Sequence, residues 1–119
     1  MEKDILFCAQ EIVNIILPQC KTFQDLIDFC ADHNCQILPD PKISIKKSAL
    51  FIDGVIIIST KLSYIQYLQI LSHEIVHCLS YNNQLNYLNT LINSKNYNRL
   101  EFIENVARET SRIISDRLK

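Results

Sequence analysis

The feature that most constrains this chain is a His-Glu-x-x-His motif, formed by His73, Glu74 and His77. On an α-helix, residues four apart lie on one face, one turn from each other. Both imidazoles can then bind the same metal ion. Glu74 points about 100° further round the helix, so its carboxylate can reach a water molecule beside the metal without binding the metal itself. The motif therefore requires a helix here and predicts a metal site with a carboxylate base next to it.

The residues around the motif have the periodicity of a largely buried helix, which we expect from about Lys61 to Ser80. Ser63 and Gln66 fit a capping box at its start. Positions three or four apart form its buried face: Leu62, Ile65, Leu68, Leu71, Ser72, Ile75, Val76 and Leu79. His73 and His77 flank this face. The alternative, two surface histidines with a salt-bridged glutamate, fits less well because these are two of only three histidines in the chain.

Length and composition favour a single domain spanning residues 1–119. With 48% hydrophobic residues the chain can bury a core, and its net charge of −1 lacks the basic surface of an autonomous nucleic-acid binder. The N-terminus, Met1–Asp4, is acidic where a secretory signal would be basic, and no apolar run is long enough to span a membrane. We therefore expect a cytoplasmic protein that binds neither nucleic acid nor membrane directly.

The cysteines and the single glycine argue against several other kinds of site. Five cysteines, an odd number, occur without a C-x-x-C pair, which favours free thiols in a reducing compartment. Cys78 follows His77 directly but points about 100° away on a helix, so we expect a buried structural thiol rather than a ligand. Gly54 is the only glycine, which excludes the glycine-rich loops that bind nucleotides.

Two helices are expected before the motif. The first runs from Asp4 to Leu17 on an apolar stripe and is ended by Pro18. The second starts after Thr22, a plausible N-cap, and ends near His33. The helix dipole favours a charged imidazole at that end, so we expect His33 to be a capping or surface residue rather than a metal ligand.

Short apolar runs predict a small antiparallel sheet between these helices and the motif. Cys35–Leu38 is the first strand, and Ile43–Lys46 alternates like a half-exposed strand. Ala49–Ile52 and Val55–Ser59 are joined by Asp53-Gly54, a strong hairpin signal. The hairpin leads directly into the motif helix. An antiparallel strand beside such a helix can hold an extended peptide by strand addition.

The remaining chain contains the candidates for the third ligand. We expect a short helix within residues 81–98 and a long one from about Arg99 to Leu118. Position 83 is asparagine, which excludes a third histidine at the spacing typical of metzincins. Glu101 falls on the polar side of the last helix, whereas Glu104 and Glu109 lie at the two margins of its apolar stripe. Spacing alone leaves Glu104 and Glu109 open, with surface ion pairing as the alternative for either.

Three segments together resemble the ImmA/IrrE family of metallopeptidases. These are Leu50–Ile57, Ile70–His77 and Glu104–Ala107. In that family a short hairpin precedes the His-Glu-x-x-His helix, and a later helix supplies the third ligand from a Glu-x-x-Ala motif. The resemblance therefore implies an α+β, zincin-like fold in which Zn²⁺ is bound by His73, His77 and Glu104. Val76 stands where the family usually has glycine.

The resemblance also implies a function. Family members are zinc endopeptidases that cleave a partner transcriptional repressor in the cytoplasm and so act as antirepressors; the partner expected here is a helix-turn-helix repressor. Glu74 would be the general base, and Tyr81, Tyr87 and Tyr97 are candidates for stabilising the oxyanion. The alternative is a non-catalytic module that binds a regulator protein, although a purely structural site does not need a carboxylate at position 74. A metal-dependent hydrolase of a non-peptide substrate is a third interpretation.

Overall fold

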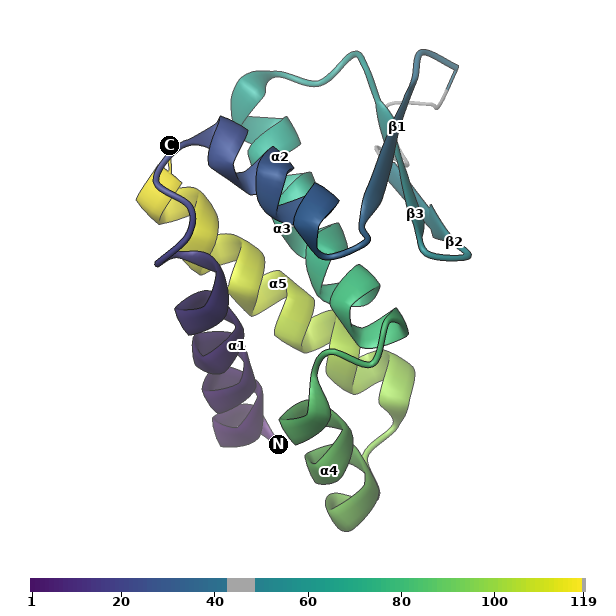
Figure 1. Ribbon diagram of the computed structural model, residues 1–119. Helices are drawn as coiled ribbons and strands as arrows, with labels where there is room; N and C mark the ends of the chain where they lie inside the picture. The colour runs from purple at the N-terminus through teal and green to yellow at the C-terminus, as the bar shows by residue number, and fades with distance from the viewer. Residues whose placement is uncertain (43–48, 119) are drawn as a thin grey trace.

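Two long helices, α3 (Tyr64–Tyr81) and α5 (Arg99–Leu118), pack against each other in the middle of the protein (Figure 1). The structure, a computed structural model, describes residues 1–42 and 49–118. The two helices are antiparallel, because hydrogen bonds join the start of each to the end of the other. The Tyr64 hydroxyl donates to the Leu118 carbonyl at 3.3 Å, and the Arg99 guanidinium donates to Ser80 Oγ at 3.3 Å.

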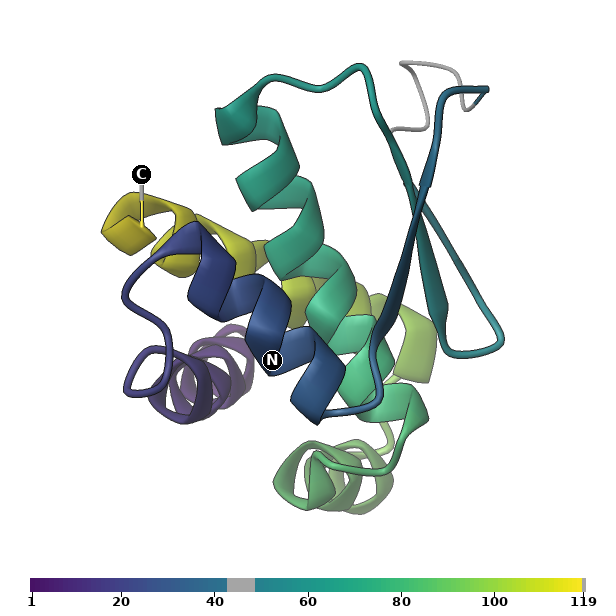
Figure 2. The ribbon, with the colours of Figure 1, turned by 45° about the horizontal axis from the view of Figure 1, so that its top comes forward.

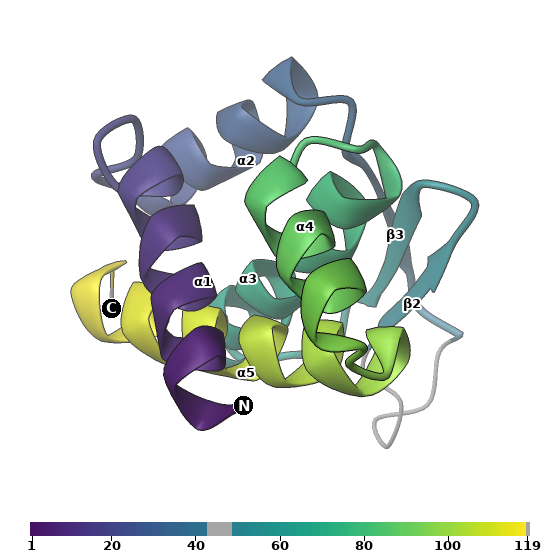
Figure 3. The same cartoon turned by 90° about the horizontal axis from the view of Figure 1, so that it is seen from below.

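Three further helices surround this pair. Helix α1 (Glu2–Ile16) packs along α5, and α4 (Asn86–Lys95) lies beside α1 on the same side, as Figure 3 shows. Helix α2 (Phe23–Asp32) comes directly before the first strand in the chain and contacts it. The apolar faces of all five helices meet in one hydrophobic core. Among the described residues, no helix combines the length and the apolar composition that crossing a membrane requires.

Capping boxes define where two of the helices begin. At α2 the Thr22 side chain accepts from the Asp25 amide and Asp25 accepts from the Thr22 amide. Ser63 and Gln66 make the same reciprocal pair at α3, as predicted. Ser63 is extended, so the motif helix starts at Tyr64, three residues after the predicted Lys61, because the residue that caps a helix cannot itself be helical.

The sheet is mixed, and the prediction of an antiparallel sheet is wrong for its first strand. Strands β2 (Ala49–Ile52) and β3 (Val55–Ser59) form the predicted hairpin, but β1 (Gln36–Asp40) pairs parallel with β3, in the order β1-β3-β2. β1 and β2 therefore lie on opposite sides of β3. Periodicity shows which face of a strand is buried but not which neighbour it pairs with. The strand expected at Ile43–Lys46 lies outside the described residues.

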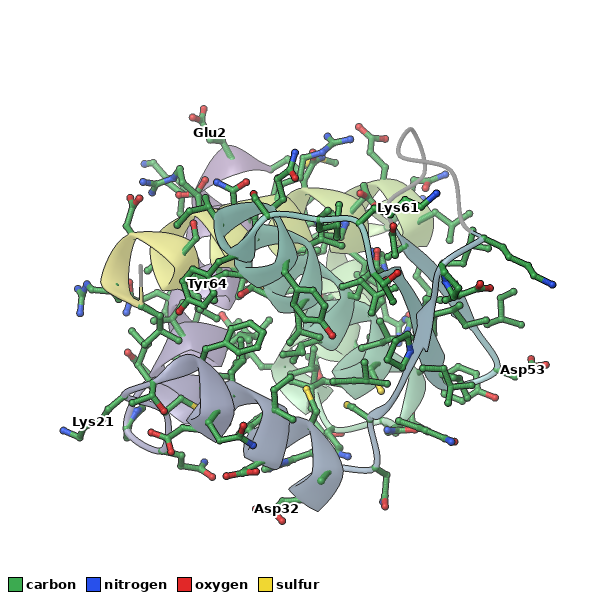
Figure 4. The ribbon with its side chains drawn as sticks, turned by 90° about the horizontal axis from the view of Figure 1, so that it is seen from above. Glu2, Lys21, Asp32, Asp53, Lys61 and Tyr64 are labelled. Carbon is green, nitrogen blue, oxygen red and sulfur yellow. The ribbon has the colours of Figure 1, made fainter. Side chains whose placement is uncertain are left out.

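The hairpin turn explains why the only glycine stands where it does. Asp53 and Gly54 both have positive φ, 50° and 83°, the combination that a two-residue type I′ turn requires. A side chain on Gly54 would also meet the Tyr81 ring at 3.1 Å. Asp53 is exposed and projects from the turn away from the helices, as Figure 4 shows. The turn therefore fixes the register in which β2 and β3 pair.

The sheet lies against one flank of α3 (Figure 2). Ile56 and Ile58 of β3 are fully buried in the core, and Phe51 of β2 packs against the core. β2 pairs only with β3, so its other backbone edge is free of any strand among the described residues. The result is an α+β architecture in which an edge strand runs beside the helix that carries the motif.

Candidate metal centre

His73 and His77 lie one turn apart on α3, at the border between the core and solvent. Their side chains are 20% and 23% exposed, and their ring centroids are 5.2 Å apart. The neighbouring Ser72, Ile75 and Val76 are fully buried, so the helix cannot rotate the two rings away from this position without exposing its apolar face. Packing of α3 therefore holds two imidazoles on the same side of the helix, at the edge of the core.

Glu104 of α5 completes the cluster. One carboxylate oxygen lies 2.8 Å from His73 Nε2, and the other lies 3.1 Å from His77 Nε2. The antiparallel packing causes this meeting, because it places the first third of α5 opposite the second half of α3. The Ser111 hydroxyl, which donates to the Gln69 carbonyl at 2.6 Å, holds the same register further along the pair.

The other two candidate glutamates are elsewhere. Glu109 accepts from Arg112 on its own helix, with 3.0 Å between Arg112 Nε and Glu109 Oε1. Glu101 is exposed in the first turn of α5. Neither belongs to the group of residues that could share a metal ion, which among the described residues is His73, His77 and Glu104. The structure therefore brings together the three predicted ligands and separates them from Glu109.

The donor atoms of the cluster could hold a metal ion. One ligand atom from each residue can be chosen so that all three lie within 4.8 Å of one another. Zinc takes imidazole nitrogen and carboxylate oxygen at about 2.0–2.2 Å in a tetrahedron, which sets ligand atoms about 3.3 Å apart. The distances to Glu104, 2.8 and 3.1 Å, run to two different carboxylate oxygens and are those of hydrogen-bonded ion pairs. The same donors also suit other divalent transition metals, so the cluster does not by itself select zinc.

The electrostatics favour a neutral imidazole at His73. Burial lowers the pKa of His73 below its ordinary value, and this effect outweighs the opposing attraction of the Glu104 carboxylate. A histidine must be neutral to bind a metal, since the proton and the metal compete for the same nitrogen. Burial of His73 therefore keeps this side chain in its metal-binding form around neutral pH.

Glu74 lies outside the cluster but close to it. Burial, together with the negative charge of Glu104, raises the pKa of Glu74 from 4.5 to about 7. A carboxylate with a pKa near the working pH can both accept and return a proton, which is the property required of a general base. Glu74 thus has the environment expected of a base beside a metal, although no ion is needed to produce the shift.

A cleft of about 420 Å³ opens beside the cluster, between α3 and α5. His73 and Glu74 form one end of it. Gln69 and Ile70 continue its wall along α3, and the α5 wall is formed by Arg108, Ser111, Arg112, Ser115 and Asp116. A substrate group in this cleft would lie directly against the carboxylate of Glu74.

The opposite side of the cluster is covered by aromatic residues. The Phe51 ring of β2 lies 6.5 Å from the His77 ring and 5.6 Å from that of Tyr81. Tyr81 is therefore the predicted oxyanion candidate whose ring packs nearest this strand. Tyr97, between α4 and α5, donates to the Asp4 carboxylate at 2.5 Å, and the Tyr87 ring packs at a tilt against Phe7, so both make contacts with α1.

The remaining histidine and the cysteines have the predicted structural positions. His33 is the C-cap of α2; its Nδ1 lies 2.9 Å from the Phe29 carbonyl and its ring stacks on Phe29 at 3.9 Å. Cys78 is buried, with Sγ 3.8 Å from the carbonyl oxygens of Asn34 and Gly54. All five cysteines are buried and free. None of these residues takes part in the cluster.

Two neighbours of the cluster were not predicted from the sequence. Phe51 is one of several alternating apolar residues in the hairpin, and nothing in that pattern marks it as the one over His77. Arg108 lines the cleft and stands one helical turn after Glu104, on the same side of α5. That four-residue spacing was the available signal, but it also fits an ordinary surface ion pair.

These features define an α+β protein with a His-His-Glu cluster able to hold a metal ion and a glutamate of raised pKa beside it. Comparison of the chain with protein-family models, with curated proteins and with solved structures finds no match.

Proposed function

We propose that this protein is a cytoplasmic zinc endopeptidase of the ImmA/IrrE type, with a zincin-like fold, that cleaves a partner protein. The observation that carries the proposal is the convergence of Glu104 on His73 and His77, with Glu74 lining the adjoining cleft. Two histidines four residues apart and a glutamate from a later helix form the ligand set of that class of enzyme. A surface ion pair would explain one of these contacts but not the base beside them.

The residues divide the chemistry between them. His73, His77 and Glu104 would hold zinc, which when bound polarises a peptide carbonyl and makes a water molecule acidic near neutral pH. Glu74 accepts the proton of the attacking water and then donates it to the leaving amine. In the metal-free protein its pKa is raised to about 7, so this carboxyl group can hold a proton near neutral pH, as the second transfer requires.

The edge strand supports a polypeptide as the substrate. Among the described residues no strand pairs with the outer backbone edge of β2, and Phe51 of this strand packs over His77. An extended peptide that pairs with β2 would pass beside the cluster, held by backbone hydrogen bonds that do not depend on its sequence. A helix-turn-helix repressor is the partner that we propose, on the basis of the family resemblance.

The proposal is tested with Glu74→Gln. The amide has nearly the shape of the carboxylate but cannot accept a proton, so zinc should remain bound while cleavage falls by at least about 10²-fold. Wild type and mutant are incubated with helix-turn-helix repressors encoded near the gene, and fragments are identified by mass spectrometry. Glu101→Gln, an exposed change of the same kind on α5, is the matched control and should cleave like wild type.

Two other outcomes would contradict this mechanism. Similar fragments from wild type and Glu74→Gln would remove Glu74 from the mechanism. Stable complexes with a repressor, equal for both proteins and without fragments from either, would favour the non-catalytic module.

A further inference from the structure

The cleft beside His73 and Glu74 has two arginines in its α5 wall, Arg108 and Arg112, that the proposed reaction does not use. The rest of the lining is Asp116, which lies beside Arg112, together with Gln69, Ile70 and two serines. The volume of about 420 Å³ is enough for one or two amino-acid side chains, but not for a folded segment. This part of the cleft is therefore of the size to select what flanks the bond being cleaved.

The two arginines differ in their partners. Arg112 is bound to Glu109, and its Nη1 lies 3.9 Å from an Asp116 oxygen. Arg108 donates from Nη1 to the Asn105 side-chain oxygen at 3.3 Å, and no ion pair between described residues involves it. A guanidinium has five N–H donors, so most of the donors of Arg108 remain available to a ligand. Arg112 is in contrast occupied by the carboxylates of its own helix.

Arg108 also lies near the candidate metal centre. It stands one turn after Glu104 on α5, and it shares the cleft with His73 and Glu74. An anion bound by Arg108 would consequently lie next to the reacting groups rather than at a remote surface.

Given the proposed function, we propose that Arg108 determines substrate specificity. It binds a substrate carboxylate in the cleft, adjacent to the scissile bond. The planar guanidinium matches a carboxylate with two parallel hydrogen bonds, a geometry that an amide cannot satisfy equally. The carboxylate has two sources. It is either the side chain of Asp or Glu in the interior of a chain, or the free carboxyl group at the end of a chain.

The test compares peptides that differ in one charge. Paired mixtures of random sequence carry a fixed Glu or a fixed Gln in the middle, each with an amidated or a free C-terminus. Cleavage of the zinc-loaded protein is read by mass spectrometry, and binding to Glu74→Gln protein is read by fluorescence anisotropy. Wild type should cleave, and the Glu74→Gln protein should bind, the carboxylate form about tenfold better than its neutral partner. A preference for fixed Glu identifies a side chain, and a preference for free C-termini identifies the chain end.

The variants assign the preference to one side chain. Arg108→Gln should abolish it, and Arg108→Glu should favour Lys or Arg at the same position. Arg117→Gln removes an exposed arginine of α5 that does not line the cleft, and it should leave the preference unchanged. Because Arg108 is also exposed, its substitution should not affect folding, which circular dichroism can verify.

The two proposals fail in different ways. Cleavage with no difference between acid and amide, or a preference that survives Arg108→Gln, would overturn the carboxylate site and leave the peptidase intact. Carboxylate-dependent binding that Arg108→Gln abolishes, without cleavage by wild type, would keep the carboxylate site but reject the proposed reaction. Absence of both cleavage and carboxylate-dependent binding would overturn both.

Discussion

At the scale of single residues, the informative side chain is Glu74. It lies largely out of solvent with another carboxylate, Glu104, nearby, and both effects disfavour its charged form. Holding a carboxylate in this place costs the fold free energy at neutral pH. Under the proposed function, this cost is explained by the role of Glu74 as the base.

The pKa of Glu74 predicts how the stability of the metal-free protein depends on pH. Between about pH 4.5 and 7 the folded protein retains a proton that the unfolded chain has released. Stability from this group is therefore complete below pH 4.5 and is lost as the pH rises through 7. Glu74→Gln removes the charge, so at pH 8 it should be more stable than wild type by about 1–3 kcal/mol.

Denaturant unfolding in the presence of a chelator measures this difference. The advantage of Glu74→Gln should shrink as the pH is lowered toward 4. The lowered pKa of His73 affects stability with the opposite sign, because the folded protein releases a proton that the unfolded chain retains, but His73 is present in both proteins and cancels from the comparison to first order. A difference in stability that stays constant from pH 4 to 8 would show that Glu74 titrates normally.

At the scale of elements, the register of α3 against α5 decides the site. Contacts along the whole pair maintain it, from Tyr64 with Leu118 through Ser111 with Gln69 to Arg99 with Ser80. Buried apolar residues on both helices, Val76 and Val106 among them, lie between these contacts. A shift of one turn would replace Glu104 by another residue opposite the histidines and would break each of these hydrogen bonds.

This register predicts which glutamate is the metal ligand. Glu104→Gln should weaken zinc binding by at least about 100-fold, because an amide oxygen is a much poorer ligand than a carboxylate. Glu109→Gln should bind zinc like wild type, since it disturbs only the pair with Arg112. Titration with a competing chromophoric chelator measures both affinities. Loss of zinc through Glu109 instead would mean that the helices are displaced relative to each other in solution.

At the scale of the whole molecule, the candidate site joins segments that are far apart in the chain. His73 and His77 come from one helix and Glu104 from another, and α4 separates them in sequence. The three side chains meet only when the core is folded. A metal that they bind is therefore bound by the native state and not by the unfolded chain, so metal binding must stabilise the fold.

Zinc should consequently raise the melting temperature. At a free zinc concentration 100 times Kd the gain is about 2.7 kcal/mol, which corresponds to a shift on the order of 10 °C for a domain of this size. His73→Ala and His77→Ala should abolish the shift, and bound zinc should fall from about one per chain to none. His33→Ala, which removes the histidine outside the cluster, is the control. An equal zinc-induced shift in melting temperature in all four proteins would contradict the metal-centre interpretation.

Local interactions explain what the sequence by itself determined. The motif helix and the last helix follow from apolar residues at helical spacing. The capping boxes at Thr22 and Ser63 and the turn at Asp53-Gly54 depend on residues close together in the chain. His73, Glu74 and His77 were identified for the same reason, since their relative positions are set by one helix.

The third residue of the cluster, the pairing of the first strand and the lining of the cleft were decided by the tertiary structure. Spacing left Glu104 and Glu109 equivalent; the family resemblance favoured Glu104, and the antiparallel packing of α3 and α5 is what places it against the two histidines. The parallel pairing of β1 with β3 and the position of Arg108 in the cleft also depend on contacts between distant segments. Periodicity records which face of an element is buried, but it carries no information on which partner buries it or in what register. Those are set by how the side chains of the whole core fit together.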